Sequence, residues 1–572
     1  MQKVSSQNPG AVTAKTPLTG GRLLVDCLRA QGVDRIFGVP GESYLEVLDA
    51  LVDVPGIEFV CTRHEGAAAN MAEADGKLTN KPGVCLVTRG PGATHAAIGV
   101  HTAAQDSTPM LLLVGQVPRD HRGREAWQEI DYGQMFGTVA KWVAEIQDPA
   151  RIPEYISRAF AVATSGRPGP VVLSLPEDML SQELPSPVDI TTLPQMTGTQ
   201  AAPAPAKVEA LLAQLRAAQR PLIWVGGSGW TPQDCVAFQE FVARWDLPVI
   251  ASFRRQDVLD NRHDNYVGHT GLGLNPKLAA RIKSADLIVA AGCRLNDPST
   301  NGYATITAPR TQQRLVHIHA DPDELGRVFA PDLAICSSMH ELLGVLGEAK
   351  LAGTAPWTSW RKEARQDFLD FTHPVAKTPR AGVDLTAVMG HLSETLPDDT
   401  VITNGAGNYT VWVHRYYRYR HPKTQLAPVS GAMGYGLPAA IAAKARFPDR
   451  KVVCFAGDGC FLMYPQEIST AVQIGAPIVI LLVNNGLYGT IRMHQERYFP
   501  GRPIGTDLPA TDFVKLAESF GAYGELVNTT AEFPAALQRA LAESRPALLE
   551  LRTDPAQITP EGRITIAQRQ DA

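Results

Sequence analysis

The stretches Lys451-Val-Val-Cys-Phe-Ala-Gly-Asp-Gly459 and Pro477-Ile-Val-Ile-Leu-Leu-Val-Asn-Asn485 decide the fold. Each is an apolar, strand-sized run that stops at glycine or polar residues, and the segment between them has helical spacing. This order predicts a strand–helix–strand unit, with Asp458 and Asn485 at the carboxyl ends of two parallel strands. Oxygen ligands at that edge suit Mg²⁺, and the flanking glycines let a phosphate approach the backbone.

The same alternation of strands and helices recurs in three parts of the chain. It predicts an α/β protein of three doubly wound parallel-sheet domains, spanning residues 18–184, 208–346 and 381–554. A Pro/Thr-rich stretch, 185–207, separates the first two domains, and a mixed stretch, 349–380, separates the last two. We expect the polar tail, 555–572, to be a flexible end rather than a flap over the site.

Composition excludes several classes of protein. The 572 residues carry a net charge of −5, so no broad basic face for nucleic acid is indicated. The eight cysteines form no CxxC pair, which argues against a zinc site and a disulfide framework. No apolar run approaches the ~18 residues that a membrane helix needs, and the first ten residues contain no apolar signal core. We therefore expect a cytoplasmic protein that binds neither nucleic acid nor membrane.

The Gly457-Asp458-Gly459 motif followed by Asn484-Asn485 resembles the fingerprint of thiamine diphosphate (ThDP) enzymes. Taken singly, the first motif would be a tight turn and the second a helix cap. The resemblance implies that Asp458, Asn485 and the backbone carbonyl of Leu487 hold Mg²⁺, which bridges the cofactor's diphosphate. It also implies that the three domains are a pyrimidine-binding, a middle and a diphosphate-binding domain, in that order.

Activation of ThDP needs a carboxylate beside the pyrimidine ring, in an apolar pocket that raises its proton affinity. Glu65 lies where an extended segment meets an alanine-rich helix, and on spacing alone it is a capping group. Arg63-His64-Glu65, followed by Arg89-Gly-Pro-Gly-Ala-Thr-His95, resembles the family's pyrimidine-domain signature and implies that Glu65 is catalytic. In that family the cofactor lies between two subunits, so the resemblance implies a homodimer or homotetramer.

The remaining cofactor contacts follow from the resemblance alone. Met433 occupies the place of the bulky side chain that bends the cofactor, although methionine is also a common core residue. Asn408 and Tyr409 replace Gln-His in a loop that contacts the diphosphate. The implied cofactor-binding residues are Gly41, Glu65, Gly405, Asn408, Tyr409, Gly431, Met433, Gly457, Asp458, Gly459, Asn485, Leu487, Tyr488 and Gly489.

Over nearly the whole chain, the sequence is most similar to acetolactate synthase large subunits, through stretches such as Asp106-Ser-Thr-Pro109 and Gly431-Ala-Met-Gly-Tyr-Gly436. This resemblance implies that Gln128 and Lys141 are catalytic residues facing the site; the alternative is that they are ordinary surface residues. The implied reaction is addition of the cofactor carbanion to a small 2-oxo acid, loss of CO₂ and attack on a second carbonyl.

Several positions depart from the synthases. Glu42-Ser43-Tyr44 replaces Gly-Ala in a loop that faces the cofactor, Gly66 stands where Gln is common, and His95 stands where the synthases have Asn. The synthases carry FAD on the middle domain. Here FAD is left open, because their Arg-Phe-Asp-Asp-Arg stretch is Arg294-Leu-Asn-Asp-Pro298 and no GxGxxG motif is present.

Basic residues follow Asn485 at Arg492, His494 and Arg497, in a pattern more typical of a solvated helix face than of a substrate site. Three alternative functions remain open. They are a ThDP lyase that forms or cleaves acyloins or diketones without decarboxylation, a flavin-containing 2-oxo acid oxidase, and a catalytically silent regulatory paralogue. Intact Glu65, Asp458 and Asn485 argue against the last of these.

Overall fold

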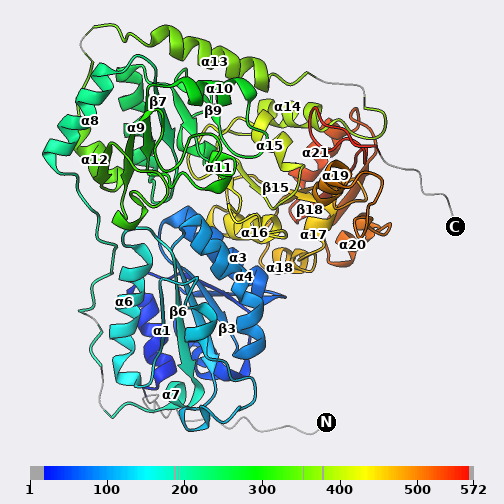
Figure 1. Ribbon diagram of the computed structural model, residues 1–572. Helices are drawn as coiled ribbons and strands as arrows, with labels where there is room; N and C mark the ends of the chain where they lie inside the picture. Colours follow the sequence, from blue (N-terminus) through cyan, green and yellow to red (C-terminus); the bar gives the residue numbers. More distant parts are fainter. Residues whose placement is uncertain (1–17, 186–187, 191, 352, 376–378, 566–572) are drawn as a thin grey trace.

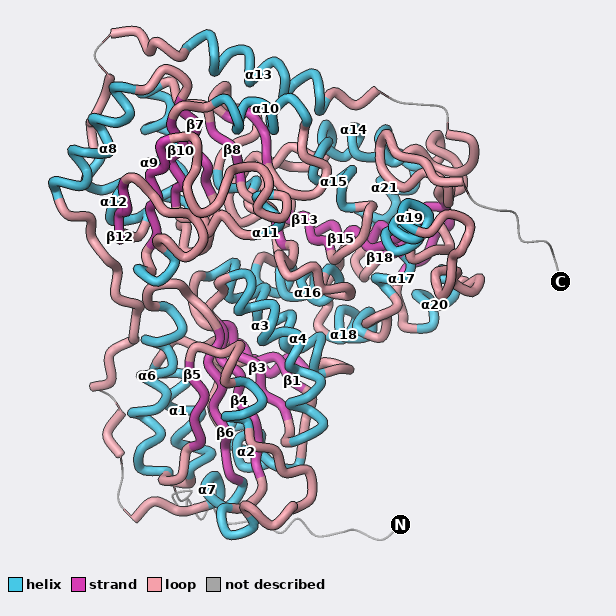
Figure 2. Tube along the Cα trace, viewed as in Figure 1, coloured by secondary structure: helices cyan, strands magenta, loops and turns pink. Residues whose placement is uncertain are grey.

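The chain folds into three α/β domains, each built on a six-stranded parallel sheet flanked by helices (Figures 1 and 2). The computed structural model describes residues 18–185, 188–190, 192–351, 353–375 and 379–565. The central strands are buried along their whole length, as expected for parallel sheets covered on both faces. The three doubly wound sheets predicted from the sequence are confirmed.

The first sheet has the strand order β2-β1-β3-β4-β6-β5. Its strands are β1 Arg35–Gly38, β2 Glu58–Cys61, β3 Gly83–Val87, β4 Met110–Gln116, β5 Trp142–Glu145 and β6 Pro170–Pro176. Its α-helices are α1 Gly20–Ala30, α2 Leu45–Val52, α3 Glu65–Thr79, α4 Gly90–Asp106, α5 Tyr132–Phe136, α6 Ile152–Thr164 and α7 Glu177–Ser181, with a 3₁₀ turn, η1, at Glu42–Tyr44.

The middle sheet has the order β12-β11-β10-β7-β8-β9, which reverses between β7 and β10. Its strands are β7 Pro221–Val225, β8 Val249–Ala251, β9 Tyr266–His269, β10 Leu287–Ala291, β11 Arg314–His319 and β12 Leu333–Cys336. Its helices are α8 Pro205–Ala217, α9 Pro232–Trp245, α10 Pro276–Ser284, α11 Asp297–Thr300, α12 Met339–Leu346 and α13 Thr358–Thr372.

The third sheet, β14-β13-β15-β16-β18-β17, repeats the topology of the first sheet strand for strand. Its strands are β13 Val401–Asn404, β14 Gln425–Leu426, β15 Val452–Gly457, β16 Val479–Asn484, β17 Tyr523–Val527 and β18 Ala547–Arg552. Its helices are α14 Leu385–Thr395, α15 Thr410–Tyr416, α16 Gly436–Arg446, α17 Asp458–Phe461, α18 Glu467–Gln473, α19 Gly489–Tyr498, α20 Phe513–Ser519 and α21 Phe533–Ala542.

The first and third domains share one hydrophobic core, which is built around the alanine-rich helices α3 and α16 (Figure 1). Small side chains let the two helices approach closely. A buried polar cluster lies at the same contact: Lys77 Nζ is 3.0 Å from the Glu73 carboxylate and 2.8 Å from that of Asp106. The Tyr435 hydroxyl donates to Glu73 over 2.6 Å. The shared core and the contact of Tyr435 with Glu73 therefore join the two domains into one packed unit.

The expectation of a flexible tail is wrong for the part of it that the structure describes. Residues 555–565 fold back on the third domain, where Glu561 pairs with Arg415 of α15 at 2.9 Å. The Ile558 side chain is 2% exposed. Burial of this apolar side chain holds the segment in place; the remainder of the tail, 566–572, lies outside the described residues.

Candidate functional site

A cavity of about 280 Å³ opens at the carboxyl ends of β13, β15 and β16 in the third domain. The strand order turns back between β13 and β15, which is where doubly wound sheets place their ligands. The structure brings together most of the predicted cofactor-binding residues here: Asn408, Tyr409, Gly431, Met433, Gly457, Asp458, Gly459, Asn485, Leu487, Tyr488 and Gly489 line this cavity.

Asp458 lies directly after β15 and is 3% exposed. Its carboxylate accepts backbone N–H groups from Gly459 at 2.8 Å, Asn485 at 3.1 Å and Gly486 at 2.7 Å. Burial raises the pKa of Asp458, while these backbone donors act to lower it. Within the described part of the chain no Lys, Arg or His forms an ion pair with it. The third domain therefore fixes a buried carboxylate without supplying a cation.

Oxygen atoms that could share a cation with Asp458 lie on the turn after β16. The amide oxygen of Asn485 accepts the N–H of Leu487 over 3.1 Å, and the carbonyl of Leu487 accepts the N–H of Gly489 over 2.8 Å. The backbone is held close to this turn: a Cβ at Gly459 would lie 2.4 Å from the Tyr488 ring. Only glycine fits there, which explains the second glycine of the motif.

The loop after β13 closes the other side of the cavity. The Tyr409 hydroxyl accepts the N–H of Gly405 over 3.2 Å and lies 3.5 Å from Cys460 Sγ, so Gly405 stands behind the wall rather than in it. The Asn408 amide oxygen accepts the hydroxyl of Thr490 over 3.0 Å. Asn408 and Tyr409 therefore hold this loop against α17 and α19.

Sequence reasoning missed several residues that line the cavity: Leu385, Trp412, Cys460, Val483, Thr490, Gln557 and Ile558. Most are apolar residues with no motif of their own. Gln557 and Ile558 belong to the tail, where Glu561 pairs with Arg415 of α15 at 2.9 Å. Arg492 of α19 was predicted to lie on a solvated face, but it is 3% exposed. It pairs with Glu496 at 3.3 Å and with Asp507 at 3.4 Å, whereas His494 and Arg497 are exposed as predicted.

Glu65 is the first residue of α3, but it does not cap the helix. The cap is His64, whose Nδ1 accepts the N–H of Gly66 over 3.0 Å. The Glu65 carboxylate lies instead 2.8 Å from Nδ1 of His95, on α4. Its side chain is 14% exposed, and no part of Glu65 lines the Asp458 cavity. Within one chain, the two predicted ends of the cofactor site lie apart.

The other predicted residues of the first domain also lie outside that cavity. Gln128 has a positive φ of 66° and places its carbonyl against Gly90 at the start of α4. Lys141 Nζ donates to the carbonyl of Ser165 over 2.6 Å. Gly41 precedes η1, and a Cβ there would lie 2.6 Å from Thr88. These assignments stay predictions.

The loop that departs from the synthases, 42–44, has its three polar side chains engaged, and Ser43 Oγ lies 2.9 Å from Thr88 Oγ1. Glu42 pairs with Arg89 over 3.3 Å. Tyr44 is 1% exposed, its hydroxyl donates to the carbonyl of Val39, and burial raises its pKa. In this chain Tyr44 is a core residue.

Comparisons with known proteins identify the family of this chain. Three family models cover the chain: the N-terminal TPP binding domain of thiamine pyrophosphate enzymes at 18–135, the central domain at 208–346 and the C-terminal TPP binding domain at 405–551. The acetolactate synthase large subunit of Parasynechococcus marenigrum is 33% identical over 95% of this chain and 89% of its own length. A probable acetolactate synthase large subunit of Methanocaldococcus jannaschii is 32% identical, over 96% and 95%. The large subunit of isozyme 3 of Escherichia coli is also 32% identical, over 92% and 93%. The chain belongs to the thiamine pyrophosphate enzyme family.

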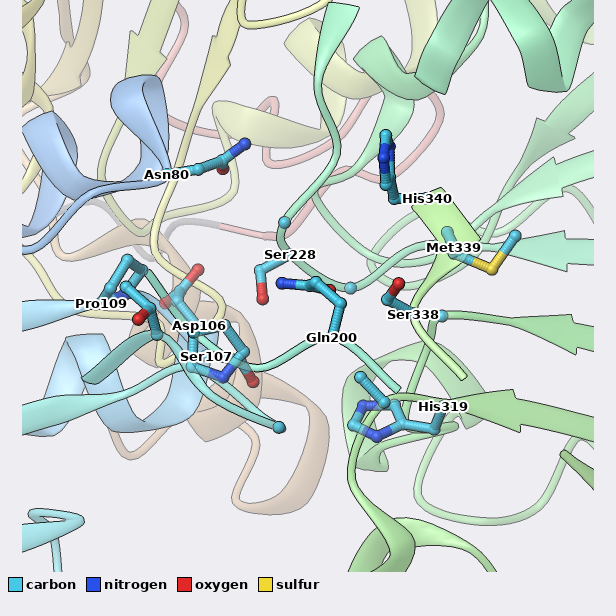
Figure 3. Close-up of a pocket in the computed structure, with 18 of the residues that line it drawn as sticks. Asn80, Asp106, Ser107, Pro109, Gln200, Ser228, His319, Ser338, Met339 and His340 are labelled. Atoms are coloured by element: carbon cyan, nitrogen blue, oxygen red, sulfur yellow. The ribbon is translucent and has the colours of Figure 1, made fainter. Parts of the chain in front are cut away.

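This thiamine pyrophosphate enzyme has a second cavity, of about 420 Å³, at the carboxyl ends of β7 and β10 (Figure 3). Asp106 and Ser107 of the first domain lie on one side of it and His319 and Ser338 on the other, with Ser228 between them. Burial lowers the pKa of His319 to about 4. The cavity thus lies at the reversal of the middle sheet, where that domain would bind a ligand.

Two arginines of the second cavity reach toward the end of α4. Arg255 donates to the carbonyl of Asp106 over 3.1 Å, and Arg294 donates to that of Gln105 over 2.9 Å. Burial lowers the pKa of Arg294 to about 10.

Among the described residues of the enzyme, no helix combines the length and apolar character needed to cross a bilayer.

Proposed function

We propose that this enzyme binds ThDP and Mg²⁺ at the Asp458 cavity and acts as an acetolactate synthase-like carboligase on a small 2-oxo acid. The observation that carries the proposal is Asp458 itself. It is a buried carboxylate at the reversal of the third sheet, held by three backbone donors and lacking a cationic partner among the described residues. Similarity to acetolactate synthase large subunits over nearly the whole chain supports the reaction class.

The donor set fits a hard divalent cation. Asp458 offers a carboxylate oxygen, Asn485 an amide oxygen and Leu487 a carbonyl, all on the wall of one cavity. Mg²⁺ prefers such oxygen ligands and completes its shell with water and phosphate. A bound cation would also stabilise the ionised form of Asp458 against the burial that raises its pKa.

Bound ThDP supplies a carbanion at its thiazolium ring and an electron sink for the substrate. The chain's own residues would orient and shield that chemistry. Glu65 would bind the pyrimidine ring and hold the proton that sets its tautomer. Met433 would separate the two rings, and the apolar side chains of Leu385, Trp412, Val483 and Ile558 would exclude water from the cavity.

Because the cavity is lined by third-domain residues and does not include Glu65, we propose that Glu65 reaches the cofactor from a second copy of the chain. The enzyme would then act as a homodimer or as a homotetramer of two such dimers. Gln128 and Lys141 would contribute from the same first domain as Glu65. The cytoplasmic location and the bounds of the three domains also stay predictions.

The middle cavity fits a nucleotide-sized cofactor, and we propose that FAD or a smaller nucleotide binds there. Its volume of about 420 Å³ lies within the range of ligand pockets. A Cβ at Gly227 would lie 1.9 Å from the Gly292 carbonyl, so the two loops that would cradle the ligand meet too closely for any side chain. Arg255 and Arg294 could hold a phosphate. The absorbance spectrum of the purified protein distinguishes a flavin from a colourless nucleotide.

The test of the function is incubation with pyruvate, ThDP and Mg²⁺, with CO₂ and acetolactate both measured. Release of CO₂ with formation of acetolactate, lost in a Glu65→Gln variant, is the expected result. Coupled product from acyloins or diketones without CO₂ would indicate the lyase instead. Oxygen consumption would indicate the flavin oxidase, and no turnover of any 2-oxo acid despite bound ThDP would contradict the proposal.

A further inference from the structure

Two histidines flank the carboxylate of Glu65. His95 Nδ1 lies 2.8 Å from a Glu65 carboxylate oxygen, and the His95 ring stacks on His64 with the ring centroids 4.6 Å apart. The Tyr464 ring lies beyond His64, at 5.1 Å. Ligand atoms of His64, Glu65 and His95 all lie within 4.8 Å of one another. The carboxylate therefore sits in a compact cluster of proton-carrying groups.

His64 acts as a hydrogen-bond acceptor in this cluster. Its Nδ1 accepts the N–H of Gly66, so that nitrogen carries no proton, and burial together with the nearby His95 lowers the pKa of His64. A neutral His64 leaves His95 as the imidazole that can exchange a proton with Glu65. In the single chain His95 is also the more open of the two, since its side chain is 52% exposed.

Among the described residues, no titratable side chain other than His95 is hydrogen-bonded to the Glu65 carboxylate. Burial raises the pKa of the Tyr44 hydroxyl, of the Cys85 thiol and of the Tyr464 hydroxyl. Burial raises the pKa of Glu467 of α18 to about 7, but its side chain is 0% exposed, and its carboxylate accepts the N–H of Arg63 over 3.1 Å and the hydroxyl of Thr470. His95 is thus the group that links Glu65 with the exterior.

We propose that His95 is a positioning residue that holds Glu65 and exchanges protons between its carboxyl group and the solvent. The inference rests on the proposed function, because it concerns the carboxylate that would activate the cofactor. In one direction the Glu65 O–H bond breaks, Nδ1 gains that proton, and the Nε2–H proton leaves to water. In the reverse direction water protonates Nε2 and Nδ1–H returns its proton to Glu65. No electron moves, and solvent supplies and accepts the proton.

An asparagine at position 95 could hold Glu65 with its amide but could not exchange protons at neutral pH. A His95→Asn variant therefore separates holding from proton exchange. His101 lies on the same helix, α4, and is exposed, so His101→Asn serves as a matched control.

The first test uses the protein without cofactor. The ring signals of His95 are followed by NMR, with each signal assigned by its absence in His95→Asn. Because the Glu65 carboxylate lies 2.8 Å from His95 Nδ1, Glu65→Gln should shift the ring signals of His95 and leave those of His101 unchanged. Unchanged His95 signals in Glu65→Gln would overturn the pair. This result does not depend on ThDP binding.

The second test measures how fast the bound cofactor exchanges its C2 proton for deuterium between pH 5.5 and 8.5. His95→Asn should bind ThDP as the parent does but exchange about a hundredfold more slowly, near the lower end of general acid–base contributions, and should lose the dependence on pH. His101→Asn should match the parent. A His95→Asn profile equal to the parent's would overturn the proposal, whereas failure of the parent to bind ThDP would overturn the proposed function itself.

Discussion

The Asp458 cavity and the Glu65 segment differ in how far one chain completes them. Asp458 is enclosed by its own domain and held by three backbone N–H groups. Glu65 is held by one imidazole that is half exposed. The diphosphate end of the proposed site is therefore built during folding of the chain, while the pyrimidine end needs something that a single chain does not supply.

Removal of the Asp458 carboxylate should have the largest effect on ThDP binding. Asp458→Ala deletes the one charged ligand for Mg²⁺, and we expect the Kd of ThDP to rise on the order of a thousandfold, about 4 kcal/mol. Calorimetric titration with ThDP at fixed Mg²⁺ measures this. Asp449→Asn, at an exposed residue before β15, is the control and should bind as the parent does. Tight binding by Asp458→Ala would refute the metal assignment.

Glu65, in the more exposed of the two regions, should control the rate of turnover rather than the binding of ThDP. Glu65→Gln keeps the shape of the side chain but cannot hold the negative charge, so we expect ThDP affinity within about threefold of the parent and turnover of pyruvate lower by roughly a hundred- to ten-thousandfold. The same calorimetry, combined with CO₂ release, separates the two quantities. If Glu65→Gln were to lose binding as Asp458→Ala does, the contrast between the two regions would not hold.

Glu467 joins the two regions, because it lies just after the Asp458 motif and accepts the N–H of Arg63, two residues before Glu65. Burial raises its pKa to about 7. A carboxyl whose pKa is raised by folding contributes stability below its unfolded pKa and loses it as the pH rises through the folded value.

Between pH 5 and 8 the free energy of unfolding of Glu467→Gln should therefore rise relative to the parent, by up to roughly 3 kcal/mol. Urea unfolding at several pH values tests this, with the exposed Glu518→Gln as the control. If the free energy of unfolding changed with pH in parallel for Glu467→Gln and the parent, the pKa of this carboxyl would not be raised.

A substitution in the described part of the tail, residues 555–565, should have the smallest effect on ThDP binding. Ile558→Ala removes buried apolar surface from the cavity wall without touching a polar contact, so we expect ThDP affinity to fall by tenfold or less, about 1 kcal/mol. Turnover at saturating ThDP should be retained. An unchanged affinity would mean that the tail does not cover the bound cofactor.

Local patterns predicted much of the fold and one half of the site. The apolar runs that end at Asp458 and Asn485 are β15 and β16, and the helical spacing between them is α18, although the short helix α17 was missed. Contacts between distant segments could not be read in this way. Arg492 is buried because Asp507 and Thr506 come from a later loop, and His64 caps α3 although Glu65 fits the capping pattern. The Glu65–His95 pair depends on the packing of α3 against α4.

The central claim, that each site takes Glu65 from one chain and Asp458 from another, is tested most directly by mixing two inactive variants. Glu65→Gln and Asp458→Ala are unfolded together and refolded at equal amounts. A mixed dimer would contain one site with both residues intact, so activity should return to about a quarter of the parent's, by random pairing of two chains. If both residues acted within one chain, mixed dimers shown by affinity tags to have formed would remain inactive, and the account would be contradicted.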